Sequence, residues 1–283
     1  MIHFIKMHGI GNDYIYVDEF LYKAPADIRD AARLASDRHT GIGGDGLILI
    51  QPSQIADCKM RMFNADGSEG RMCGNAIRCI ARYMLERHPE ICPGDTVRIE
   101  TLSGIKIVTA QRDAEGKPSM LRADMGAPGL SPESIPVLTA TPQDLSIEVP
   151  GFSGRGVCVS MGSPHIVFFI DSDPSELDIA HIGPAIESHS LFPERVNVEF
   201  VQTQPDGSLK MRVWERGSGE TMACGTGACA TAVAAMLKGR TPQRTATVHL
   251  RGGDLIIEWN PDNNRVYMTG PAALVFEGEW LEA

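Results

Sequence analysis

Residues 60–75 of the chain read MRMFNADGSEGRMCGN, and residues 211–226 read MRVWERGSGETMACGT. The Met-Arg, Glu and Cys-Gly positions of the two strings coincide at an offset of 151 residues. The same offset aligns two further pairs, Gly11 with Gly162 and Thr96 with Thr247. The alternative is a chance Cys-Gly match between two glycine-rich loops, but then the flanking strands would not keep the same register. The sequence therefore predicts two copies of one fold.

Each copy has strand-like segments before the glycine-rich loop and a helix after it. In the first copy the predicted strands are residues 2–7, 14–17, 47–50 and 59–63. From residue 74 the apolar side chains follow helical spacing, and they are Ile77, Ile80, Ala81, Met84 and Leu85. The second helix, residues 225–239, is rich in small residues, which suits a helix enclosed on several sides.

Hairpin-like strands follow each helix, at residues 96–109 and 247–259. We therefore expect an α+β fold of two pseudo-symmetric domains, each a mixed, mostly antiparallel sheet wrapped around a central helix. The polar segment DAEGKPS, residues 113–119, predicts the domain boundary. Residues 267–280 look like one strand that returns to the first domain.

These patterns predict an N-terminal domain of residues 1–118 plus 268–283 and a C-terminal domain of residues 119–267. The active site is expected in the cleft between them.

Composition restricts the class of partner. The 283 residues carry a formal net charge of −10, which disfavours a nucleic-acid surface, and aromatic residues make up only 6%. The longest nearly apolar stretch, residues 223–237, is shorter than the ~18 residues that a membrane span needs. The N-terminus MIHFIKMHG does not resemble a signal peptide. We expect a cytoplasmic protein with a small-molecule partner, and neither a nucleic acid nor a membrane.

The seven cysteines are an odd number without a C-x-x-C pair, so neither a disulfide framework nor a zinc site is expected. Five of them are interpreted as small buried side chains, namely Cys58, Cys79, Cys92, Cys158 and Cys229. Cys73 and Cys224 differ, because each lies at the same point of the repeat, between the loop and the helix.

A helix N-terminus presents unpaired N–H groups and a partial positive charge. Such a site predicts a thiol with a lowered pKa and a place for a carboxylate. Gly74 and Gly225 would let a ligand approach the backbone closely. Inversion of a carbon centre needs a base on one face and an acid on the other, and two thiols would supply both. The duplicated cysteines thus indicate an isomerase.

Six strings of the chain resemble the diaminopimelate epimerase family: KMHGIGNDY, FNADGSEGRMCGN, MGSPH, ESHSLFPERVN, WERGSGETMACGTGAC and MTGPA. The resemblance extends along essentially the whole chain. It implies a cofactor-independent enzyme that interconverts LL- and meso-2,6-diaminopimelate in the biosynthesis of lysine and peptidoglycan precursors. It also implies a small amino-acid substrate, no metal and a possible homodimer.

The resemblance also implies roles for individual residues. Cys73 and Cys224 would be the acid/base pair, and His165 and Glu215 would influence the pKa values of the two thiols. The implied substrate-binding residues are Asn12, Asn64, Gly74, Asn75, Ser163, Asn197, Glu215, Arg216, Gly225 and Thr226. Arg216 suits a carboxylate and Glu215 an ammonium group.

Simpler interpretations exist for several of these residues. Asn12 and Asn64 could be turn residues, Arg216 a surface charge, and His165 a hydrogen-bonded core histidine. Three aspartates, Asp13, Asp45 and Asp66, look like turn or cap residues and receive no role.

The chain departs from the family pattern at two positions. Ser163 stands where Asn is frequent, and Gly46 stands where some members have Gln. On this resemblance, a substrate contact at Ser163 would be shorter or water-mediated. At Gly46 the side-chain contact would be absent, although the backbone could substitute for it, so both changes bear on substrate affinity.

Three other functions fit parts of this pattern. A proline or hydroxyproline racemase would use the same two thiols but would not need Glu215 and Arg216 together. A thiol hydrolase would use one cysteine with His165, and the second cysteine would have no function. In a non-catalytic binding protein, Cys73→Ala would leave all measurable behaviour unchanged.

Overall fold

The computed structural model describes residues 1–281, and the chain divides into two units. Unit 1 comprises Met1–Asp124 and the C-terminal segment from Thr269, and unit 2 comprises Met125–Met268. The last two residues of the predicted segment 268–283 lie outside the described residues. The division falls later than the predicted residue 118, because DAEGKPS forms the turn of a hairpin within unit 1. In that turn Asp113 N donates to Lys117 O at 2.9 Å.

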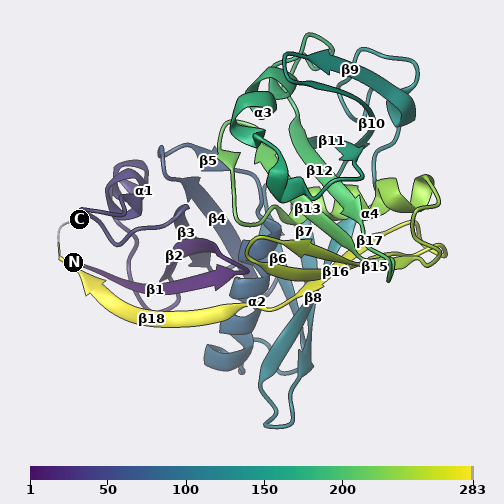
Figure 1. Cartoon of the computed structure of the whole chain (residues 1–283). Coiled ribbons are helices and arrows are strands. Elements are labelled where there is room, and N and C mark those ends of the chain that lie inside the picture. The colour runs from purple at the N-terminus through teal and green to yellow at the C-terminus, as the bar shows by residue number, and fades with distance from the viewer. Residues whose placement is uncertain (282–283) are drawn as a thin grey trace. The chain divides into compact units, whose positions relative to one another are not determined.

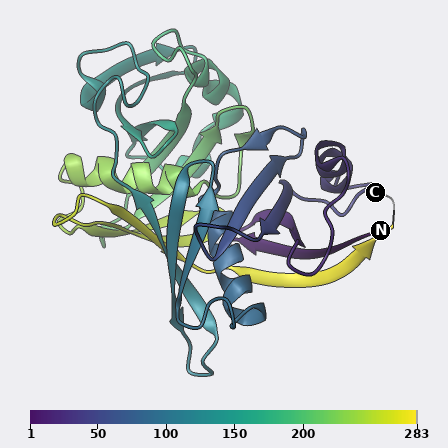
Figure 2. The same ribbon diagram turned by 180° about the vertical axis from the view of Figure 1, so that it is seen from behind.

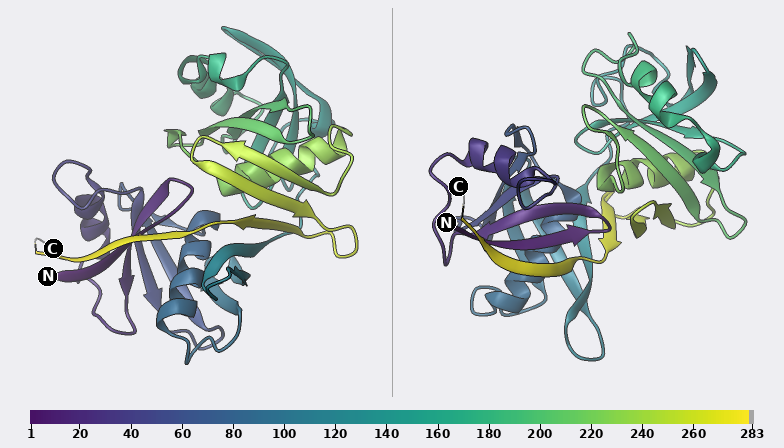
Figure 3. Two further views of the ribbon diagram at one scale, coloured as in Figure 1. Left: turned by 60° about the horizontal axis from the view of Figure 1, so that its bottom comes forward. Right: turned by 60° about the vertical axis from the view of Figure 1, so that its left-hand side comes forward.

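Unit 1 is built on a mixed sheet (Figure 1). Its strands are β1 Ile2–Gly9, β2 Asn12–Asp18, β3 Gly46–Gln51, β4 Cys58–Asn64, β5 Glu69–Gly70, β6 Thr96–Thr101, β7 Gly104–Arg112, β8 Pro118–Gly126 and β18 Ala273–Trp280. The pairs β2–β3 and β4–β6 are parallel. Pairing is antiparallel at β1–β2, β3–β4, β4–β5, β6–β7 and β7–β8. Strand β18 runs antiparallel beside β1, as Figure 3 shows.

Helix α2, Gly74–Arg87, is the central helix of unit 1 and packs against β1, β6 and β7 (Figure 2). The side chains of Ile77, Ile80 and Met84 on it are fully buried, as their spacing predicts. A second, shorter helix, α1 Ile28–Ser36, starts at the N-cap Asp27 and packs on β3 and β4.

Unit 2 repeats this architecture. Its strands are β9 Leu145–Val149, β10 Phe152–Ser160, β11 Pro164–Phe169, β12 Asn197–Thr203, β13 Leu209–Glu215, β14 Gly219–Glu220, β15 Thr245–Leu250, β16 Gly253–Trp259 and β17 Val266–Gly270. The central helix is α4, Gly225–Leu237, and α3 spans Ile179–Glu187. Short 3-10 turns occupy Pro142–Asp144 and Pro174–Glu176. Again two pairs are parallel, β11–β12 and β13–β15.

The 151-residue offset reappears in the strand register. Phe63 pairs with Glu69 in unit 1, and Trp214 pairs with Glu220 at the equivalent place in unit 2. Both central helices begin one residue after a cysteine N-cap. The predicted fold class, two similar domains of mixed sheet around a central helix, is confirmed.

Two helices were not predicted, and one expectation about a strand was wrong. The sequence analysis did not predict helices α1 and α3. Residues 267–280 are not one strand, because Pro271 lies between β17 and β18 and lacks the N–H that a continuous ladder needs.

Candidate active site

Cys73 is the N-cap of α2 and is partly exposed. Its Sγ donates to Asn12 Oδ1 at 3.2 Å, and Asn75 Nδ2 donates to the same oxygen at 3.1 Å. Asn12 starts β2 after a tight turn in which Ile10 and Gly11 both have positive φ, 46° and 85°. A β-branched residue at positive φ is uncommon and is found where surrounding structure enforces it. The turn therefore directs Asn12 at the first turn of α2.

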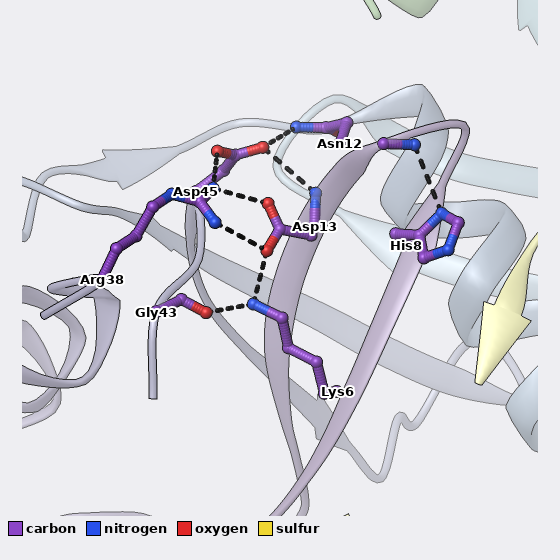
Figure 4. A network of polar contacts seen from close by, with 8 residues as sticks. Lys6, His8, Asn12, Asp13, Arg38, Gly43 and Asp45 are labelled. Carbon is purple, nitrogen blue, oxygen red and sulfur yellow. Dashed lines mark hydrogen bonds and ion pairs between the residues drawn. The ribbon is translucent and has the colours of Figure 1, made fainter. Parts of the chain in front are cut away.

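The side-chain amide of Asn12 is held by a network of charges, shown in Figure 4. Asn12 Nδ2 donates to Asp45 Oδ2 at 2.7 Å, and the Asp13 backbone N–H donates to the same oxygen at 3.1 Å. Arg38 bridges Asp13 and Asp45, and Lys6 pairs with Asp13 at 2.6 Å. Because a carboxylate can accept from the nitrogen of the Asn12 amide but not from its oxygen, that oxygen is left to face Cys73.

Burial raises the pKa of Asp45, and the neighbouring Asp13 adds to the rise. Burial also acts to raise the pKa of Asp13, but hydrogen bonds and charges from Arg38 and Lys6 outweigh it and lower the value. Asp13 and Asp45 are thus parts of one network that orients Asn12. Our interpretation of them as turn and cap residues was incomplete.

The side chain of Asn75 is held by a hydrogen bond from another residue of α2. Arg78, which is fully buried one turn along α2, donates to Asn75 Oδ1 at 2.9 Å and to Gly74 O at 3.2 Å. A Cβ at Gly9 would lie 2.9 Å from Arg78 Nη2 and 3.0 Å from Asn75 Cβ, so glycine is required there. The sequence analysis missed Arg78, although its position three residues after Asn75 places both on one helix face.

Asn64 ends β4 and begins the loop that leads to Cys73. Its Nδ2 donates to Ser68 Oγ at 3.0 Å, and its backbone N–H donates to Ser68 O at 2.8 Å. These bonds belong to a turn. Substrate binding by Asn64 remains a prediction.

Cys224 is the N-cap of α4 and is 4% exposed. The Gly227 backbone N–H donates to its Sγ at 3.3 Å, and Thr226 Oγ1 lies 3.5 Å away. Glu215, at the end of β13, forms a side-chain hydrogen bond with Cys224 and accepts from Thr221 Oγ1 at 2.5 Å. The structure thus brings Cys224, Thr226 and Glu215 together.

The expectation of a lowered pKa was wrong for Cys224. Burial raises the pKa of its thiol well above the usual value, and the charges of Glu215 and Glu199 raise it further. Hydrogen bonds from Thr226 and Gly227 act in the opposite direction but are outweighed. Burial likewise raises the pKa of Glu215.

His165 lies on β11 and is fully buried, as is Glu199 on β12. His165 Nδ1 lies 2.7 Å from Glu199 Oε1, and His165 Nε2 lies 3.0 Å from Ser163 Oγ. Burial raises the pKa of Glu199, and the neighbouring His165 opposes this rise. The sequence analysis missed Glu199, although alternation along β12 places it on the same face as Asn197.

Asn197 and Arg216 are linked to one another. Asn197 Oδ1 accepts the backbone N–H of Arg216 at 2.9 Å, and Asn197 Nδ2 donates to Pro164 O at 2.8 Å. The Arg216 side chain is exposed and donates to Glu194 O at 2.8 Å. The guanidinium group therefore stands at the surface of unit 2 beside the end of β13.

The remaining five cysteines are buried, and none of them forms a disulfide bond within residues 1–281. Burial raises the pKa of Cys79 and Cys92 to about 11 and that of Cys158 to about 12. Within residues 1–281 the structure contains no cluster of three or more His, Cys, Asp or Glu side chains suited to a metal ion. Over the same residues, no helix combines the length and the apolar character that a membrane crossing requires.

Known proteins resemble this chain along most of its length. The family described as Diaminopimelate epimerase matches residues 4–130 and 157–275. A protein named diaminopimelate epimerase from Acetivibrio thermocellus is 52% identical over 98% of both chains. Proteins of the same name from Moorella thermoacetica and Methanococcus maripaludis are 52% and 51% identical, over 99% and 98% of both chains.

Two solved structures share the fold at low sequence identity. A phenazine biosynthesis protein of the PhzF family from Enterococcus faecalis has a TM-score of 0.70 at 18% identity, covering 99% of this chain and 100% of that one. A probable proline racemase from Agrobacterium radiobacter has a TM-score of 0.69 at 16% identity, covering 100% and 94%. At such identities the likeness establishes the fold alone.

Proposed function

Because the chain belongs to the diaminopimelate epimerase family, we propose that it interconverts LL- and meso-2,6-diaminopimelate by proton transfer between two thiols. The observation that carries the proposal is the duplicated N-cap cysteine, Cys73 on α2 and Cys224 on α4. One thiolate would remove the α-proton and the opposite thiol would supply a new one. Two such groups need no pyridoxal phosphate.

The surroundings of Cys224 suit the proton donor of such a pair. Burial and the Glu215 carboxyl favour its thiol form. When the substrate places its own ammonium group near Glu215, the negative field on the sulfur falls and the thiolate becomes accessible. The roles of Cys73 and Cys224 would then exchange in the reverse reaction.

The rest of the substrate would be held by groups that the units already orient. The N–H groups at the start of α2 and α4 would bind the carboxylate at the reacting carbon. Arg216 would bind a carboxylate at the far end and Glu215 an ammonium group. Because thiols must stay reduced for this chemistry, we propose that the enzyme acts in a reducing compartment such as the cytoplasm.

The test follows LL-diaminopimelate in D₂O by NMR. Each thiol carries one exchangeable proton, so early product should contain deuterium at the inverted carbon while the remaining substrate keeps protium. Cys73→Ala and Cys224→Ala should each lower turnover by at least about 10²-fold. The matched controls are Cys79→Ala and Cys229→Ala, in the same two helices, which should retain turnover.

Three results would contradict the proposal. Product that retains its original proton would argue against exchange with two thiols. Unchanged turnover in either Cys73→Ala or Cys224→Ala would exclude that residue from the chemistry. Turnover of proline instead of diaminopimelate would assign the chain a different substrate.

A further inference from the structure

Glu199 is a buried acid to which no role has been given so far. It lies on β12, and its side chain is fully enclosed. Oε1 lies 2.7 Å from His165 Nδ1, while Oε2 has no hydrogen-bond partner among residues 1–281. A buried carboxyl with one unpaired oxygen costs free energy, so a reason for its presence is required.

Glu199 lies against the first turn of α4. A Cβ on Gly227 would lie 2.7 Å from Glu199 Oε1 and 3.2 Å from Cys224 Sγ. The missing side chain at Gly227 therefore makes room for Glu199 directly beside the candidate catalytic sulfur. The N-terminal end of α4 also favours negative charge at this place.

The number of protons on the His165–Glu199 pair follows from burial. Both side chains have 0% exposure, so a net charge on the pair would be strongly disfavoured. Two arrangements are neutral overall: an imidazolium beside a carboxylate, and a neutral imidazole beside a protonated carboxyl. In the first, both ring nitrogens carry protons. In the second, the carboxyl proton occupies the Nδ1 contact, because a proton on Oε2 would have no acceptor among residues 1–281. The ring proton then lies on Nε2.

Both neutral arrangements thus place a proton on Nε2. This nitrogen lies 3.0 Å from Ser163 Oγ, so it donates to the hydroxyl oxygen. The hydroxyl hydrogen of Ser163 then cannot point at His165 and is available to a ligand. Ser163 is half-buried, so a ligand can reach it.

We propose that Glu199 is a positioning residue that keeps a proton on His165 Nε2 and thereby makes the Ser163 hydroxyl a donor toward the substrate. The group that it would meet is a carboxylate oxygen, which accepts such a bond. This part rests on the proposed function, because the substrate must carry the carboxylate. The proton on Nε2 does not depend on the identity of the substrate.

The first experiment measures the His165 ring by ¹⁵N NMR in the ligand-free enzyme, with His165→Asn used only to assign the signals. We expect a protonated Nε2. A bare Nε2 in the wild-type enzyme would overturn the proposal, whatever the substrate is. If Nε2 is protonated but diaminopimelate is not turned over, the proposed function fails and the proton arrangement stands.

The second experiment is a double-mutant cycle between Ser163→Ala and Glu199→Leu. A hydrogen bond to a charged group contributes roughly 1.5–3 kcal/mol, so Ser163→Ala should raise KM about tenfold or more, with little change in kcat. In the Glu199→Leu enzyme nothing holds Nδ1, and the effect of Ser163→Ala should shrink toward none. Additive effects of the two changes on KM would overturn the proposal, because a merely structural glutamate predicts additivity.

Glu199→Gln keeps a hydrogen-bond partner for His165 Nδ1. It provides a second variant for the case in which Glu199→Leu does not fold. An amide can leave Nε2 protonated or bare, and the NMR measurement shows which. If Nε2 is protonated in the Glu199→Gln enzyme, Ser163→Ala should still raise KM, and if Nε2 is bare it should not. The reverse result in either case would overturn the proposal. Asp173→Asn is the control, since it removes an acid paired with Lys210 elsewhere in unit 2.

Discussion

At the residue scale, Cys224 shows that a helix N-terminus does not by itself set the state of a thiol. The sulfur receives the N–H of Gly227, as a thiolate would require. Yet the side chain is enclosed, and two acidic groups, Glu215 and Glu199, lie close enough to oppose a negative charge. Burial and like charge therefore outweigh the helix, and the thiol persists.

Removal of one of these acids should change the thiol in a known direction. Glu215→Gln deletes a negative charge beside Cys224, so the pKa of the thiol should fall and the thiolate should form at lower pH. The measurement is the pH dependence of Cys224 alkylation by iodoacetamide, followed by peptide mass spectrometry in a Cys73→Ala background. The midpoint of the alkylation rate should move to lower pH.

Asp173→Asn serves as the control, because Asp173 pairs with Lys210 elsewhere in unit 2. Its alkylation profile should match that of the parent. A Glu215→Gln profile that stays unchanged or moves to higher pH would show that hydrogen bonding from Glu215, rather than its charge, governs the sulfur.

The sequence pointed to the two candidate catalytic cysteines more clearly than to the residues that orient the other side chains of the site. Cys73 and Cys224 were evident because the repeat aligns them. Asp45 and Glu199 were not, since each acts through a neighbour distant in sequence, as when Asp45 orients Asn12. Such contacts depend on strand pairing that a single sequence does not specify.

At the scale of elements, the β3–β4 pair explains why this chain carries glycine at position 46. Gly46 pairs with Asn64 across the two strands. A Cβ at Gly46 would lie 2.1 Å from the Phe63 carbonyl oxygen, far inside contact distance. In this chain the strands approach too closely for a side chain at that position.

Gly46→Ala should therefore force the two strands apart at the end that carries Asn64. We expect a loss of roughly 1–3 kcal/mol in the free energy of unfolding, measured by urea denaturation. The KM for diaminopimelate should also rise if Asn64 binds substrate. Gly94→Ala is the matched control, because a Cβ there would meet nothing within 4 Å. Equal stability of the two variants would contradict this account of the strand pair.

Elements were predicted where their pattern was strong. The apolar spacing after Gly74 located α2, and the repeat then located α4. Helix α1 was missed because its buried face consists of small side chains such as Ala31, Ala32 and Ala35. Helix α3 was missed because it contains Pro184, which argues against a helix interior.

At the scale of the whole molecule, duplication gives each unit its own core and one candidate catalytic cysteine. The equivalent ion pairs Arg61–Glu69 and Arg212–Glu220, at 2.8 and 2.7 Å, brace the loop before each cysteine. The fold class and the repeat were readable from sequence for this reason. The exact domain boundary was not readable from the sequence, because the polar segment DAEGKPS, which suggested it, is a hairpin turn within unit 1.

Because the two units are covalently joined, one chain holds both thiols at a high effective concentration. We expect each chain to catalyse with its own pair. A mixture of the Cys73→Ala and Cys224→Ala enzymes should then remain as inactive in diaminopimelate epimerisation as either alone, at every protein concentration. When either variant is mixed with the wild-type enzyme, the activity should equal that of the same amount of wild-type enzyme alone. Activity that returns when the two variants are combined, and that rises more steeply than protein concentration, would instead mean that one reaction uses thiols from two chains.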